Sequence, residues 1–261
     1  MTYVIAISNE KGGVAKTTTT LSLGAALEEL GKKILLIDLD AQANLTLGLG
    51  LEPGSSALTS SDVLLESVPL ENVWQKTGVP NLDIVPSGQK MDRAEQLLPI
   101  HLNYAARLTD AIFVAQPMVY DFILIDCPPA LGAVTLNALN AANLLIIPTQ
   151  AEYFSAYALR NMMSIINRAR KESNPNLAYR VLITMLDRRN RTHRTIQEQL
   201  KSAFGSGLFE NVIEIDTKLR ESPILGLPIT HYKSNTRGSE QYRALAQELV
   251  EYVKETNQQP A

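Results

Sequence analysis

Residues 9–20, NEKGGVAKTTTT, bring glycines, lysines and hydroxyl side chains together at a spacing that suits phosphate binding. They nearly match the pattern G-x-x-x-x-G-K-[ST], in which backbone N–H groups, a lysine and a hydroxyl surround phosphate oxygens and Mg²⁺. Glu10 and Ala15 stand where the pattern has its two glycines. An additional lysine, Lys11, precedes Lys16 by five residues. The stretch therefore indicates either a damaged phosphate loop or a loop with a second task.

The expected roles within this loop follow from the residue types. Backbone N–H groups of residues 12–17 would surround the β-phosphate, and Lys16 would bridge the β- and γ-phosphates. The Thr17 hydroxyl would ligate Mg²⁺, and Thr18 would reach the α-phosphate. The expected cofactors are ATP and Mg²⁺. The alternative to a phosphate loop is an ordinary strand-to-helix turn capped by threonines. The loop residues predicted to contact nucleotide are Gly12, Gly13, Val14, Ala15, Lys16, Thr17 and Thr18.

Three aspartates follow apolar runs and are predicted to complete the site. DFILID ends at Asp126, and the prolines that follow it end the strand abruptly. ILLIDLDAQAN supplies Asp38 and Asp40, two residues apart and hence on the same side of an extended chain. Ligands gather at the carboxyl edge of open parallel sheets. We expect Asp126 to hold Mg²⁺ through water or an outer contact, Asp38 to support Thr17 and the metal-bound waters, and Asp40 to orient the attacking water.

Short runs rich in Ile, Val and Leu alternate with helical patterns, such as the one over 21–30 that Gly31 closes. This alternation predicts an α/β fold with a mostly parallel twisted sheet flanked by helices on both faces. The loop at residues 9–20, placed after the first strand, indicates that the fold is of the P-loop NTPase kind. We expect one domain over 1–256, an excursion of loop and short helix over 51–80, and a short polar tail at 257–261. The expected strands are 3–8, 33–38, 82–86, 121–126, 143–148 and 180–186.

The charge distribution is lopsided, although the net charge is only −3. Residues 1–150 hold 8 Lys and Arg against 15 Asp and Glu, whereas residues 151–261 hold 16 against 12. This asymmetry indicates that the second half faces a polyanion. The single cysteine, Cys127, excludes a disulfide framework and a Cys-rich metal site, and it is typical of a reducing cytoplasm. We expect no secretory signal and no membrane span, because the apolar runs are far shorter than about 20 residues.

Together, KGGVAKTTT, LIDLDAQANLT and ILIDCPP resemble the ParA/MinD class of deviant phosphate-loop ATPases. QAEYFSAYAL, TMLDRR and LRESPILGLPI are similar to the ParA (Soj-like) branch, and the likeness runs from about residue 2 to about residue 250. The resemblance implies a ParA-type ATPase domain over 1–256 that forms a homodimer around two ATP molecules. It also implies that Lys11 reaches the nucleotide bound by the partner subunit. Together with Lys16 on the phosphates and Asp40 on the attacking water, this makes Lys11, Lys16 and Asp40 the expected catalytic residues.

General chemistry agrees with that role for Lys11. A residue that precedes two glycines lies at the mouth of the loop, and a cation supplied by a second subunit stabilises charge that builds up on the transferred phosphoryl group. The alternative is a solvated loop lysine. The family usually has Gly where Ala15 stands and Pro where Ala41 stands. We expect the backbone at Ala15 to adopt the negative φ that suits a Cβ, and we expect slow turnover.

The resemblance implies that Met185, Ile215 and Asp216 contact the adenine. A further departure lies beside them, because Glu214 stands where relatives commonly have Pro.

A basic cluster in LDRRNRTHR, with further cations downstream, is predicted to contact DNA. It lacks a helix-turn-helix or an aromatic stacking module, so we expect non-specific, salt-sensitive binding to duplex DNA. Arg189 and Lys218 match basic residues that lie on the DNA-binding face of the dimer in ParA relatives. A solvated charged face is the alternative. The residues expected to contact DNA are Arg188, Arg189, Arg191, Lys218 and Arg220.

The resulting hypothesis is an ATP hydrolase that binds the nucleoid in the cytoplasm and positions a cargo, such as a chromosome, a plasmid or a protein assembly. A ParB-like adaptor would stimulate hydrolysis together with DNA. A MinD-like positioning ATPase is one alternative, but the C-terminal helix carries Glu248, Glu251 and Glu255 and is too acidic for a membrane surface. A metabolic enzyme of the same fold is the other alternative.

Overall fold

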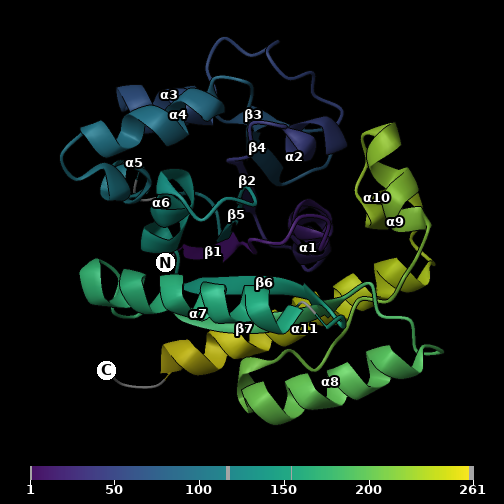
Figure 1. The fold of residues 1–261 in the computed structure, drawn as a ribbon. Coiled ribbons are helices and arrows are strands. Elements are labelled where there is room, and N and C mark those ends of the chain that lie inside the picture. Colours follow the sequence, from purple (N-terminus) through teal and green to yellow (C-terminus); the bar gives the residue numbers. More distant parts are fainter. Residues whose placement is uncertain (1, 116–117, 154, 259–261) are drawn as a thin grey trace.

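A computed structural model describes residues 2–115, 118–153 and 155–258. The described residues contain one seven-stranded sheet of order β3-β4-β2-β5-β1-β6-β7 (Figure 1). Every neighbouring pair is parallel except the β3–β4 pair. The predicted α/β fold is confirmed. The strands are β1 Tyr3–Ile7, β2 Ile34–Asp38, β3 Gln75–Lys76, β4 Leu82–Val85, β5 Phe122–Asp126, β6 Leu144–Gln150 and β7 Ala178–Thr184.

The six predicted strands all form, and none of their ends shifts by more than two residues. β3 was not predicted, because Gln75 and Lys76 are polar and two residues are too few to show alternation. The central strands are continuous apolar runs because both of their faces are covered: every residue of β2 and of β5 is buried.

Helices cover both faces of the sheet (Figure 1). The core on one face is formed with α1, α2, α9, α10 and α11, and the core on the other face is formed with α3 to α8. The α-helices are α1 Lys16–Glu29, α2 Asn44–Gly48, α3 Ser60–Glu66, α4 Met91–Leu97, α5 Arg107–Val114, α6 Ala133–Ala141, α7 Ser155–Glu172, α8 Arg191–Phe204, α9 Lys218–Glu221, α10 Ile229–Tyr232 and α11 Arg237–Gln258. Short 3-10 turns occupy Leu70–Asn72, Leu98–Ile100, Tyr104–Ala106, Gly205–Gly207 and Ser222–Leu225.

The strand order places the acidic strand ends side by side. β5 lies between β1 and β2, and in the register Asp126 is paired with Ile7 on one side and with Asp38 on the other. Since the glycine loop leaves β1 directly, the loop and both aspartates meet at one edge of the sheet. This edge is where α/β sheets bind ligands.

The connecting regions and the C-terminal helix complete the described structure. The stretch 51–80 contains α3, one 3-10 turn and the short β3, joined by loops. α11 continues to Gln258, two residues into the predicted tail, while 259–261 lie outside the described residues. Among the helices in the described part of the chain, none combines the length and apolar character needed to cross a bilayer.

Candidate functional site: a phosphate loop and its surroundings

The loop between β1 and α1 adopts a conformation that its sequence did not predict. Gly13 has φ 73°, as glycine readily allows, but Ala15 has φ 68° and ψ 35°. The expectation of a negative φ at Ala15 was therefore wrong. The surrounding loop imposes the left-handed conformation usual for glycine, and Ala15 carries the steric strain of its Cβ there. A side chain added to Gly12 or Gly13 would meet nothing within 4 Å, so the loop mouth is open.

Lys16 begins α1 and lies beneath this loop. Its side chain is mostly buried, and its Nζ donates to the Lys11 carbonyl at 3.3 Å. Desolvation lowers the pKa of Lys16, although the nearby carboxylate of Asp126 opposes the shift. A desolvated ammonium at the N-terminus of a 14-residue helix is well suited to bind phosphate oxygens, because the helix dipole and free N–H groups point the same way.

Asp126 is joined to α1 by two hydroxyl groups. Thr17 Oγ1 donates to Asp126 Oδ2 at 2.7 Å, and Thr20 Oγ1 donates to Asp126 Oδ1 at 3.1 Å. Thr17 and Asp126 were predicted from the sequence, whereas Thr20, which lies one helical turn after Lys16, was not. Burial, and secondarily the charge of Asp38, raises the pKa of Asp126 to about 8. A cation at this position would favour the ionised carboxylate.

Asp38 contacts Thr46 of α2 and the Asp40 backbone rather than Thr17. Its Oδ2 accepts hydrogen bonds from the Thr46 backbone at 2.9 Å and from the Thr46 hydroxyl at 2.8 Å, and its Oδ1 accepts from the Asp40 backbone at 3.1 Å. The expected support of Thr17 by Asp38 is not formed, because the Thr17 hydroxyl donates to Asp126 instead. Asp38 thereby fixes α2 and the loop that carries Asp40.

Asp40 lies further out on that loop and is partly exposed. Its Oδ1 accepts a hydrogen bond from the Gln42 backbone at 3.0 Å. Asp40, Gln42 and Asn44 line the same cavity as the phosphate loop. The carboxylate is thus held by a turn at the edge of the site, where water has access.

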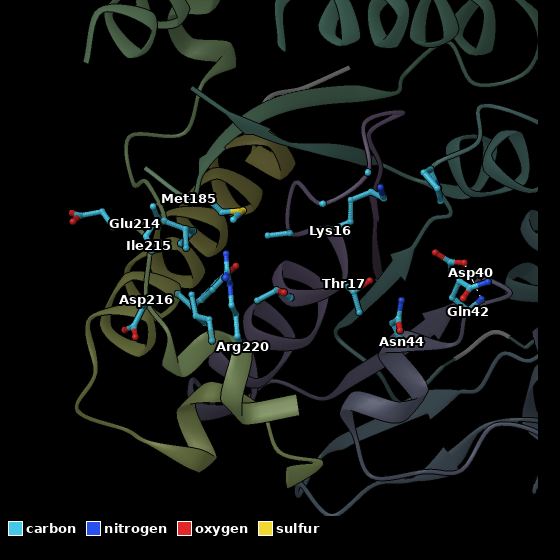
Figure 2. Close-up of a pocket in the computed structure, with 18 residues that line it drawn as sticks. Lys16, Thr17, Asp40, Gln42, Asn44, Met185, Glu214, Ile215, Asp216 and Arg220 are labelled. Carbon is cyan, nitrogen blue, oxygen red and sulfur yellow. Dashed lines mark hydrogen bonds between the residues drawn. The ribbon is translucent and has the colours of Figure 1, made fainter. Parts of the chain in front are cut away.

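The cavity has a volume of about 490 Å³, within the range usual for small-molecule sites. Figure 2 shows Lys16 and Thr17 between two walls. One wall carries Asp40, and the other carries Met185, Glu214, Ile215, Asp216 and Arg220. Of the residues predicted to contact nucleotide, the lining includes Gly12, Gly13, Ala15, Lys16, Thr17, Thr18, Met185, Ile215 and Asp216.

The cavity wall far from Asp40 is formed by the segment that follows β7 and by the 213–216 segment paired with it. Met185 has a left-handed backbone with φ 53°, and residue 186 then pairs with the 213–215 segment in a short parallel bridge. The Asp216 carboxylate accepts hydrogen bonds from the Lys218 and Gly238 backbones, both at 2.9 Å, and so is committed to the starts of α9 and α11. Arg220, predicted to contact DNA, lines this wall as an exposed side chain.

Val14 and Lys11 are the predicted nucleotide contacts that do not line this cavity among the described residues. The Val14 side chain is buried, and its carbonyl accepts a hydrogen bond from Thr184 Oγ1 at 3.0 Å. Lys11 Nζ donates to Gln150 Oε1 at 3.1 Å and forms an ion pair with Glu152 Oε2 at 2.5 Å. Lys11 therefore points away from its own phosphate loop.

Gln150 was missed by the sequence analysis. It ends β6, and its Nε2 donates to the Gly13 carbonyl at 3.2 Å and to Met185 Sδ at 2.9 Å. It thus joins the phosphate loop, the opposite wall and Lys11. A polar residue ending the buried run NLLIIPTQ was the available signal.

The residues predicted to contact DNA lie mainly on the turn after β7 and on the short helix α9. Three of these five residues form ion pairs with nearby carboxylates. These pairs are Arg188 with Glu214 at 2.6 Å, Arg189 with Asp187 at 3.1 Å, and Lys218 with Glu221 at 2.6 Å.

The residues present fit Mg²⁺ held together with phosphates. A threonine hydroxyl and a carboxylate are hard oxygen donors of the kind Mg²⁺ prefers. Within the described residues, no group of three or more His, Cys, Asp and Glu side chains is placed to hold a metal alone. Such a sparse protein set is usual where substrate phosphates and waters supply most of the ligands.

Comparisons with known proteins decide the family. A family model described as an AAA domain matches residues 2–179. The chain is 38% identical over 251 residues to the sporulation initiation inhibitor protein Soj of Bacillus subtilis, covering 96% of this chain and 99% of Soj. It is 36% identical to the chromosome partitioning protein ParA of Caulobacter vibrioides, covering 95% of this chain and 93% of that protein.

The chain belongs to the ParA/Soj-like family of deviant phosphate-loop ATPases.

The chain is also similar to a solved structure that holds a nucleotide analogue and magnesium. The cobyrinic acid a,c-diamide synthase of Mycobacterium smegmatis, with a bound ATP analogue and magnesium, superimposes with a TM-score of 0.84 at 30% identity. The match covers 100% of this ParA-family chain and 99% of that one. The resemblance that the sequence predicted is thereby confirmed, and the ligands of the solved relative match the predicted cofactors.

Proposed function

We propose that this ParA-family protein is a partition ATPase. It binds ATP with Mg²⁺, closes into a sandwich dimer, and in that state binds duplex DNA without sequence preference. The coarser assignment, a positioning ATPase of the ParA/MinD class, follows from family membership. Its cargo would be a chromosome, a plasmid or a protein assembly, linked through a ParB-like adaptor that stimulates hydrolysis, and its location would be the nucleoid in the cytoplasm.

The position of Lys11 carries this proposal. Lys16 already lies at the phosphate-binding cavity, whereas the Lys11 ammonium lies outside it in an ion pair with Glu152. The Lys11 side chain is 27% exposed, so the ion pair is accessible to water and weak. A facing subunit that offers a triphosphate can therefore compete for this cation. The supplied cation would stabilise charge on the γ-phosphate of the partner's nucleotide.

The other site residues have separable roles in this reaction. The phosphate loop and Lys16 hold and neutralise the phosphates, and Thr17 with Asp126 would hold Mg²⁺ directly and through water. Bound Mg²⁺ would neutralise charge that develops on the β- and γ-oxygens. Asp40, held by its turn at the edge of the cavity, would orient the attacking water. The strained Ala15 and the need for a second subunit support the expectation of slow turnover.

The experiment follows ATP-dependent dimerisation and DNA binding on the same samples. With ATP and Mg²⁺, the wild type is expected to become a dimer by light scattering and to shift duplexes of unrelated sequence equally. Lys11→Ala should remain monomeric and fail to shift DNA, while Lys254→Ala, which removes an exposed lysine of α11, should behave like the wild type. A stable ATP dimer of Lys11→Ala would refute the role in trans, and absence of DNA binding by the wild-type dimer would refute the partition role.

A metabolic enzyme of the same fold is the second candidate, because the solved relative is described as a diamide synthase. The two functions differ in what raises ATP turnover. DNA together with a basic adaptor peptide should stimulate the partition ATPase, whereas a carboxylate substrate with an amide donor should stimulate a synthase. A MinD-like ATPase would instead bind anionic vesicles, which the acidic α11 disfavours.

A further inference from the structure

The wall of the cavity opposite Asp40 carries a carboxylate on its outer side. Glu214 points away from the cavity in Figure 2. Its Oε1 accepts from Arg188 Nε at 2.6 Å and from Gln241 Nε2 at 3.1 Å, and its Oε2 accepts from Arg237 Nη1 at 3.0 Å. The Glu214 side chain is only 11% exposed, whereas those of Arg188 and Arg237 are 64% and 54% exposed. One largely buried carboxylate therefore anchors two exposed guanidinium groups.

The same short segment forms the cavity wall and anchors the arginines. The Leu186 backbone donates to the Ile213 carbonyl at 3.0 Å and accepts from the Ile215 backbone at 3.1 Å. Arg237 Nη2 donates to the Ile215 carbonyl at 2.6 Å. Residue 215 lines the cavity, so Arg237 contacts the nucleotide-binding wall directly as well as through Glu214.

The net charge of Glu214 and its two arginines determines how strongly this surface attracts a polyanion. Arg188 and Arg237 together contribute two positive charges, and Glu214 cancels one of them while holding both side chains against the wall. Both guanidinium groups of these ion pairs are exposed to water and salt, which weaken the attraction, so DNA phosphates can displace the carboxylate, but they must do so in competition. The Arg189 pair differs, because its partner Asp187 lies on the same exposed turn rather than on the cavity wall.

We propose that Glu214 is a positioning residue that keeps Arg188 and Arg237 paired on the back of the nucleotide-binding wall, so that DNA phosphates compete with its carboxylate for both arginines. This inference rests on the proposed DNA-binding function. It adds a connection between the two sites: DNA that takes Arg237 also removes the hydrogen bond to the Ile215 carbonyl. Nucleotide and DNA affinities are then linked, and the linkage is reciprocal.

The test is the salt dependence of DNA binding by the ATP-bound dimer. Glu214→Gln keeps the size of the side chain and removes its charge, and Glu214→Asp keeps the charge. Glu210→Gln is the matched control, because it removes an exposed carboxylate from the same segment, four residues away. Fluorescence anisotropy with a labelled duplex across a salt series gives the slope of log K against log[salt], and light scattering on the same samples reports dimer formation.

Glu214→Gln is expected to bind DNA more tightly at low salt, with a slope steeper by about 1 to 2 per protomer, since each additional phosphate contact adds about 0.9. Glu214→Asp and Glu210→Gln should stay near the wild-type slope. Equal slopes for Glu214→Gln and Glu210→Gln, with wild-type binding intact, would overturn this inference alone. Failure of Glu214→Gln to bind ATP or to dimerise would also overturn it, by showing that Glu214 only supports the cavity. A wild-type dimer that ignores DNA would refute the proposed function itself.

Discussion

Replacing Ala15 with glycine tests the strain that the phosphate loop imposes on this residue. Ala15 has φ 68° and ψ 35°, a conformation that costs an L-residue about 1–2 kcal/mol relative to the right-handed region. Glycine adopts it without that penalty, but it gains about 0.4–1 kcal/mol of conformational freedom in the unfolded chain. The difference predicts that Ala15→Gly raises the free energy of unfolding by roughly 0.5–1 kcal/mol. For a chain of this size, the melting temperature should rise by about 1–4 °C.

Two further alanines calibrate this measurement. Ala43 also has a positive φ, 50°, at the start of a helix, so Ala43→Gly should stabilise in the same direction. Ala111 lies in the interior of α5, where Ala111→Gly should instead lower stability by about 1 kcal/mol. Denaturant unfolding of the nucleotide-free proteins measures all three. If Ala15→Gly destabilises the fold as Ala111→Gly does, the reasoning from the left-handed backbone is refuted.

Two other predictions concern the strand-end aspartates. Burial raises the folded-state pKa of Asp126 to about 8 from its usual 3.8, so its contribution to the stability of the nucleotide-free protein is present below about pH 4 and is lost as pH rises through 8. Asp126→Asn should flatten that part of the profile of melting temperature against pH and impair Mg²⁺-dependent hydrolysis; superimposable profiles would contradict the assignment. Asp40→Ala should still bind ATP and dimerise while turnover falls by about 10²-fold or more, measured as phosphate release, and normal turnover would exclude Asp40 from positioning the water.

The amino-acid sequence determined most of the fold, because continuous apolar runs and glycine-closed helical patterns are local properties. It also determined that a phosphate loop and acidic strand ends would share one sheet edge, since parallel strands all end at that edge. The short β3 gave no such pattern.

The partners of each side chain depended on the tertiary structure. Strand order and register placed Asp126 beside Thr17 and turned Asp38 toward Thr46, a choice between two similar strand-end aspartates that local sequence does not encode. The left-handed backbone of Ala15 is set by the closed loop around it, which overrides the preference of alanine. The ion pair of Lys11 with Glu152 joins residues far apart in the chain, so only the packed sheet, with β1 beside β6, brings those two charges together.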